Sequence, residues 1–204
     1  EPDYGAYHRH FRDAPPGRLR GESTPAYLYW PTAAGRIRAY HPGMRLIFIL
    51  RNPVERAYSH YVMKRLDGEE PLPFPEALRR EEARIAAGAR DRLVYSYIDR
   101  GRYAGQILRF RKAFPEDRLL FLKTEDLRER HAETMARVIS FLGLPPGPLT
   151  RHEIVDLNVS TALRGDFAAA HVDGDQSQVL ATDTQKNTAF AFAKKHGYSI
   201  PGLG

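Results

Sequence analysis

The chain has 204 residues, 42% of them hydrophobic, and a formal net charge of +6. This length and composition allow one good-sized core, so we expect a single domain over residues 1–204. The absence of cysteine excludes disulfides and thiolate metal sites, and no apolar run is long enough to span a membrane. No signal peptide is recognisable at its start, and a cysteine-free chain suits a reducing compartment, so we expect a cytoplasmic protein.

The positive charge comes mostly from arginine, whose planar fork matches the oxygens of phosphate and sulfate. Phosphorylated cofactors, acidic glycans and nucleic acid are therefore the candidate anionic partners. A GC-rich genome explains the same arginine bias equally well. Nucleic acid ranks last among these partners, because basic residues alternate with acidic ones, as in Arg79–Glu82, and this pattern is typical of a solvated helix face.

The first half of the chain alternates strand and helix patterns, which favours an α/β fold. Arg18–Glu22 is predicted as a short strand, and a helix is predicted from Pro31 to about Tyr40. Met44–Leu50 (MRLIFIL) is a continuous apolar run, which predicts a strand buried on both faces of a mainly parallel sheet. Asn52 is a good N-cap for a helix that ends near Leu66.

The second half continues the alternation. The patterns predict helices over about Pro75–Ala87, Tyr95–Phe114 and Ala132–Leu142, with a strand at Arg118–Lys123 between the last two. After Arg151 the patterns weaken, and residues 168–204 are poorly assigned: Ala168–Thr184 is typical of a polar surface segment, and a short terminal helix is expected at Phe190–Lys195.

The segment Leu50–Tyr61 (LRNPVERAYSHY) carries the strongest chemical signal. Arg51 follows a buried strand, at the edge where open α/β sheets bind ligands, and Ser59 lies about two turns into the next helix. The two side chains can converge on one phosphate, and the helix amino terminus is expected to add free N–H groups. Arg56 is offset around the helix from Ser59. The alternative is an ordinary strand followed by a capped helix with a surface arginine.

This segment strongly resembles the 3′-phosphate-binding motif of PAPS-dependent sulfotransferases, especially the bacterial members and the heparan sulfate sulfotransferases. The resemblance implies a P-loop-NTPase-like three-layer fold, with a central mainly parallel sheet flanked by helices. It also implies that Arg51 and Ser59 hold the 3′-phosphate of PAPS. GESTPAYL (Gly21–Leu28) and FPEDRLLFLKTEDL (Phe114–Leu127) resemble further blocks of the family, in the family's order.

A third block, DRGRYAGQILRF (Asp99–Phe110), is similar to the family's K-G-x-Y-x-x-x-L segment. The match implies that Arg100, Gly101 and Tyr103 contact PAPS, with arginine here where lysine is common. An amphipathic tyrosine in an ordinary helix core is the alternative interpretation of Tyr103.

One family signature, the K-x-G-T-T-type P-loop that holds the 5′-phosphosulfate, does not occur in the 204 residues. Either this segment is missing from the chain, or the chain is an inactive relative. Glu1-Pro2 resembles the K-E-P-H-F block of the heparan-type relatives, which makes Glu1 the candidate general base. His8 and His10 are alternative bases, because imidazole titrates near neutral pH.

The resemblance implies transfer of a sulfuryl group from PAPS to a hydroxyl or amine, with release of PAP and without a metal ion. A carbohydrate, a lipid and a natural product all remain possible acceptors. The alternative is a non-catalytic module that binds PAP or another nucleotide. The sequence predicts neither the acceptor nor the oligomeric state.

Overall fold

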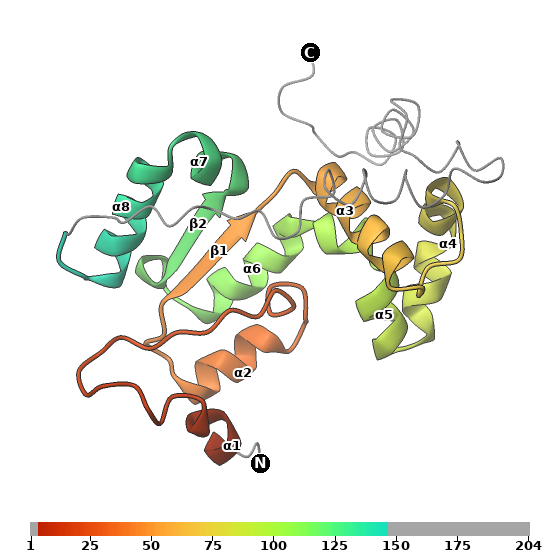
Figure 1. Cartoon of the computed structure of the whole chain (residues 1–204). Coiled ribbons are helices and arrows are strands. Elements are labelled where there is room, and N and C mark those ends of the chain that lie inside the picture. Colours follow the sequence, from red (N-terminus) through yellow and green to blue (C-terminus); the bar gives the residue numbers. More distant parts are fainter. Residues whose placement is uncertain (1–3, 147–204) are drawn as a thin grey trace.

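The computed structural model describes residues 4–146 of the chain (Figure 1). In chain order the elements are α1 (Tyr4–Arg9), α2 (Ala33–Tyr40), β1 (Leu46–Leu50), α3 (Pro53–Leu66), α4 (Phe74–Ala87), α5 (Ala89–Tyr95), the 3₁₀ turn η1 (Asp99–Gly101), α6 (Tyr103–Ala113), the 3₁₀ turn η2 (Glu116–Arg118), β2 (Leu119–Lys123), α7 (Thr124–Glu129) and α8 (His131–Leu142).

The two strands β1 and β2 are parallel neighbours, with Leu46 opposite Leu119 and Leu50 opposite Lys123. Parallel neighbours need a crossover connection, and here the crossover is the whole run from α3 to η2. Both strands therefore end at the same edge of the sheet. The Thr124 hydroxyl ties this edge together by donating to the Leu50 carbonyl at 3.1 Å.

Helices flank the two strands, as Figure 1 shows with α2 and α6 on one side and α7 and α8 on the other. The α6 side holds the main core. There the Phe48 ring meets the edge of Phe110 at 4.8 Å between centroids and stacks on Phe121 at 5.0 Å. Ala33 and Ala34 of α2 complete this core. The expectation of a parallel α/β arrangement is confirmed.

A second core joins α3 and α4 to the segment after α5. Its buried members are Val54, Ala57, Tyr58, Tyr61, Phe74, Ala77, Leu78 and Tyr97. All of these except Tyr97 lie at helical spacing on α3 or α4, so each of the two helices packs through one apolar stripe.

The carboxylate of Glu70, in the α3–α4 connection, is 2% exposed and lies inside this second core. One oxygen accepts hydrogen bonds from Arg84 and the Tyr97 hydroxyl, both at 2.7 Å, and the other accepts from the Leu72 N–H at 3.0 Å. The Arg84 guanidinium also covers the Tyr95 ring, 3.3 Å from its centroid. A buried charge is tolerated when it is paired and hydrogen-bonded, so this network fixes the connection.

Three element predictions are wrong. Arg18–Glu22 is exposed and forms no strand, since within residues 4–146 the sheet consists of β1 and β2 alone. The strand β1 is not buried on both faces: Phe48 is buried, whereas Ile49 is 56% exposed.

The predicted helix Tyr95–Phe114 is interrupted between Ser96 and Arg102. The reason is tertiary, because the N–H groups of Ile98 and Asp99 bond to the Glu81 carboxylate at 2.7 Å each. The short helix α7 was not predicted. Among residues 4–146, no helix combines the length and apolar character needed to cross a membrane.

Glu70→Ala should lower the free energy of unfolding by about 3 kcal/mol, because it removes the buried carboxylate that holds the half-buried Arg84, Tyr97 and the Leu72 N–H. Urea denaturation followed by circular dichroism measures this change. Glu76→Ala is the matched control on α4, where Glu76 pairs with the exposed Arg79 and Arg80, and it should have a much smaller effect. Equal effects of the two substitutions would contradict the structural role of Glu70.

Candidate binding site at the carboxyl end of β1

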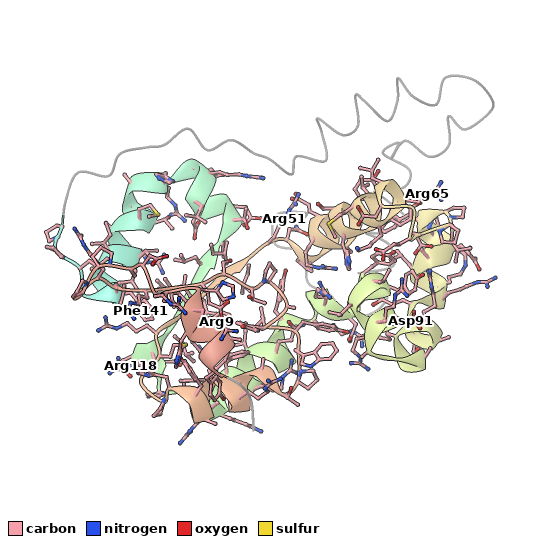
Figure 2. All side chains as sticks on the ribbon, turned by 60° about the horizontal axis from the view of Figure 1, so that its bottom comes forward. Arg9, Arg51, Arg65, Asp91, Arg118 and Phe141 are labelled. Carbon is pink, nitrogen blue, oxygen red and sulfur yellow. The ribbon has the colours of Figure 1, made fainter. Side chains whose placement is uncertain are left out.

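Arg51 leaves the tip of β1, and Figure 2 shows it where the strand passes into α3. Its Nε and Nη2 atoms both lie 3.2 Å from Oε2 of Glu55, one helical turn further along. The Arg51 side chain is 29% exposed, so its guanidinium remains open to solvent on part of its edge. A half-exposed arginine at this edge of a parallel sheet is suited to bind an anion.

The amino terminus of α3 is fully capped by the protein itself. The Asn52 side chain accepts hydrogen bonds from the N–H groups of Val54 at 2.9 Å and Glu55 at 3.4 Å. Pro53 has no N–H, and the Arg56 N–H bonds to the Asn52 carbonyl. The expectation that free N–H groups at this terminus contribute to phosphate binding is therefore wrong. A phosphate here would be held by side chains.

Ser59 lies two turns into α3 and is partly exposed. Within residues 4–146 its hydroxyl makes no hydrogen bond. It shares a stripe of the helix with Glu55, four residues earlier, and Glu55 in turn contacts Arg51. Glu55 thus has Arg51 as its ion-pair partner and Ser59 as its neighbour on the helix stripe.

Gly101 connects this site to the turn η1. A Cβ atom at Gly101 would lie 3.0 Å from the Cβ of Pro53, the first residue of α3. The close approach explains why glycine occupies a buried position beside the phosphate motif.

Tyr103, two residues later, is half-buried. Burial raises the pKa of its phenol, while the charges of Arg56 and Arg51 and a hydrogen bond from the Arg51 backbone act in the opposite direction. The structure therefore places Tyr103 beside the Arg51 backbone, and contact of Arg51, Gly101 and Tyr103 with PAPS stays a prediction.

The Arg100 side chain contacts other residues of the chain rather than pointing freely into solvent. Its Nη2 donates to the Leu93 carbonyl at 3.1 Å, and its guanidinium lies 4.9 Å from the centre of the Tyr29 ring. Burial lowers the pKa of Arg100. Contact between Arg100 and PAPS stays a prediction.

Two residues that position the site were missed by sequence reasoning. The Arg56 guanidinium reaches across from α3 to the carbonyl groups of Ser96, at 3.2 Å, and Tyr97. Burial lowers its pKa to about 10.

Glu81 of α4 was predicted as part of a solvated helix face. It is instead buried, and its carboxylate caps the start of the turn η1 by accepting hydrogen bonds from the N–H groups of Ile98 and Asp99. Burial raises its pKa to about 7, against the effect of its two backbone hydrogen bonds. A charged helix pattern gave no signal for this burial, because the turn it caps is distant in sequence.

The candidate bases are placed differently. Glu1 lies outside the described residues. His8 is exposed, and its Nε2 lies 2.8 Å from the Tyr40 hydroxyl at the end of α2. The helix α1, which carries His8, lies away from the connection between β1 and α3 (Figure 1).

His10 is also exposed and makes no contact that would direct it to the site among residues 4–146. In the same part of the chain, no group of three His, Cys, Asp or Glu side chains is arranged to hold a metal ion.

The family model for the sulfotransferase domain matches residues 30–187. The chain belongs to the sulfotransferase domain family. It is 35% identical over 128 residues to human heparan sulfate glucosamine 3-O-sulfotransferase 6, covering 63% of this chain and 36% of that protein. It is 34% identical over 138 residues to mouse heparan sulfate glucosamine 3-O-sulfotransferase 3B1, covering 66% and 34% respectively. The chain thus spans about a third of the length of these two relatives.

Among solved structures, a sulfotransferase from Alicyclobacillus acidocaldarius superposes with a TM-score of 0.67 at 30% identity, covering 82% of this chain and 67% of that one. This match confirms the predicted P-loop-like fold with a parallel sheet flanked by helices. A short likeness also exists to the uricase of Arthrobacter globiformis, 68% identical over 44 residues, which is 22% of this chain and 15% of that enzyme. So small a share of the uricase assigns no function to the chain.

Gly101→Ala should lower the free energy of unfolding by about 1–3 kcal/mol, because the added methyl group overlaps Pro53. It should also weaken ligand binding, since it displaces the start of α3. Gly105→Ala is the matched control: it lies in α6 with nothing within 4 Å of the added methyl, and it should stabilise the helix by about 0.5–1 kcal/mol. Urea denaturation compares the two, and a neutral Gly101→Ala would contradict the close contact.

His60, next to Ser59 on α3, gives the chain a pH-dependent stability. It is buried against the edge of Tyr97, with centroids 5.1 Å apart. Burial, with the nearby charges of Arg56 and Arg100, lowers its pKa to about 3. Between pH 6.5 and about 3 the unfolded chain therefore binds the proton more readily, so this contribution to stability is present above pH 6.5 and is lost as the pH falls.

The unfolding free energy should decrease by about 1 kcal/mol per pH unit below pH 6 because of His60. His60→Gln should flatten this part of the profile in denaturation measurements at pH 4.5, 5.5, 6.5 and 7.5. His10→Gln, which replaces an exposed histidine in the same way, is the control. Unchanged slopes in His60→Gln would contradict a neutral buried imidazole.

Proposed function

We propose that this chain provides the 3′-phosphate-binding part of a PAPS-dependent sulfotransferase. The enzyme transfers a sulfuryl group from PAPS to a hydroxyl or amine of a carbohydrate, lipid or natural product and releases PAP. The observation that carries the proposal is the half-exposed Arg51 at the tip of β1, with the unbonded Ser59 hydroxyl on the adjacent helix stripe. An arginine fork and a hydroxyl are both suited to phosphate oxygens.

In this reaction the acceptor atom attacks sulfur while the bond from sulfur to the 5′-phosphate oxygen breaks, and PAP leaves. The acceptor proton must pass to a base, and Glu1 remains the proposed base. The residues at the end of β1 lie at the other end of the nucleotide. We propose that they contribute by positioning, since a fixed 3′-phosphate orients the phosphosulfate for in-line transfer.

Gly101 and Tyr103 are proposed to line the same cofactor site, because both lie against the start of α3 beside Arg51. Arg100 is proposed to contact the cofactor only if its guanidinium leaves the Leu93 carbonyl. PAPS as donor, the cytoplasm as location and a catalytic mechanism without a metal ion belong to the same proposal.

A second candidate function is a non-catalytic module that binds PAP. It is favoured by one specific observation: the 204 residues contain no K-x-G-T-T-type segment to hold the 5′-phosphosulfate. Both candidates share the 3′-phosphate site. A sulfate-transfer assay separates them, because only the enzyme converts PAPS to PAP in the presence of an acceptor.

Calorimetry with PAP and ADP tests the 3′-phosphate assignment directly. Both nucleotides carry two phosphates, and they differ in whether the second lies at the 3′ or the 5′ end. PAP should bind more tightly than ADP. Arg51→Ala should weaken PAP binding about ten- to a hundredfold, because it removes a charged hydrogen-bonding group, and Ser59→Ala should weaken it several-fold.

Arg90→Ala is the matched control, since Arg90 is an exposed arginine of α5 and its loss should leave PAP binding unchanged. Equal affinities for PAP and ADP, or an unaltered preference in Arg51→Ala, would overturn the assignment.

A further inference from the structure

Glu55 is the one acidic side chain in direct contact with Arg51 among residues 4–146. One carboxylate oxygen, Oε2, accepts a hydrogen bond from Nε of Arg51 at 3.2 Å and forms an ion-pair contact with Nη2 at the same distance. The contact occupies one of the two edges through which a guanidinium can form paired hydrogen bonds. Glu55 therefore covers part of the surface that Arg51 would use to bind a phosphate.

The position of Glu55 on α3 also matters for Ser59. The two residues are four apart, so their side chains are neighbours on one helix stripe. A phosphate that contacts both Arg51 and Ser59 must lie close to the Glu55 carboxylate. A carboxylate and a phosphate repel one another, and the repulsion is strongest where solvent screening is incomplete.

Glu55 differs from the other carboxylate at this edge. Glu125 of α7 accepts a hydrogen bond from the Asn52 N–H at 3.4 Å, so it belongs to the cap that fixes α3. Glu55 has Arg51 as its partner and is 52% exposed. Its side chain can therefore turn into solvent at little cost, because an exposed ion pair contributes only about 0–1 kcal/mol.

We propose that Glu55 competes with the 3′-phosphate for Arg51, and that this competition weakens PAP binding and speeds PAP release. The inference rests on the proposed function, since it takes Arg51 as the phosphate ligand. It assigns Glu55 to a different role from Arg51 and Ser59: the carboxylate limits how tightly the product is held. In an enzyme that releases PAP on every cycle, such a limit favours turnover.

The test measures PAP affinity by calorimetry and PAP release by stopped-flow displacement in the full chain, with Glu55→Gln beside wild type. Glutamine keeps the size and the helix propensity of the residue and removes the charge. Glu55→Gln should bind PAP about two- to fivefold more tightly, with most of the change in the release rate. Glu82→Gln, an exposed charge removal on α4, is the control and should leave both quantities unchanged.

A second comparison shows whether Glu55 acts through Arg51. In the Arg51→Ala background, Glu55→Gln should change PAP affinity by less than it does in wild type, because the guanidinium for which Glu55 and the phosphate compete is absent. Equal effects in the two backgrounds would overturn competition for Arg51.

A Glu55→Gln variant that binds PAP as wild type does, or more weakly, would also overturn the proposal, since Glu55 would then be a spectator or a residue that positions Arg51. If wild type itself fails to prefer PAP over ADP, the 3′-phosphate assignment has failed, and the role of Glu55 fails with it. The wild-type preference and the ratio between variant and wild type are separate measurements, so the two failures are distinguishable.

Discussion

The contact between Gly101 and Pro53 is the constraint on which the rest of the site depends. A turn and a helix start that are far apart in the chain meet closely enough that a single added carbon would lie 3.0 Å from the proline ring. This contact sets where α3 begins, and so where Arg51, Glu55 and Ser59 lie relative to Tyr103. The site is therefore an assembly of the β1–α3 connection with the turn before α6.

Buried charged groups fix the position of the β1–α3 connection relative to the turn before α6. Glu81 caps the turn η1 from α4, and Arg56 reaches the preceding carbonyl groups from α3. Glu70 does the same for the α3–α4 connection through Arg84 and Tyr97. Burying these groups costs solvation free energy, and the hydrogen bonds offset that cost only in one geometry. Polar groups thus specify the arrangement, while the apolar residues of α3 and α4 supply most of the burial.

The proposed anion site differs from a phosphate site built on a helix terminus. Asn52 and Glu125 satisfy the backbone groups at the start of α3, so the positive charge offered to a ligand comes from Arg51. The Glu55 carboxylate forms an ion pair with Arg51. A site of this kind depends on two or three side chains, so we expect it to be sensitive to single substitutions. These side chains are different from the charged residues that stabilise the fold, such as Arg56, Glu70 and Glu81.

The sequence by itself determined the local elements and the motif. The apolar run ending at Leu50, the Asn52-Pro53 helix start and the spacing of Arg51 and Ser59 all depend on neighbours in the chain, and β1, α3 and the sulfotransferase family followed from them. Tertiary structure decided the break before Gly101, the exposure of Ile49, the burial of Glu81 and the contact of the Asn52 N–H with Glu125. Each of these depends on a partner at least seventeen residues away or on which strand faces which helix. The hydrophobic pattern within one segment predicts neither of these.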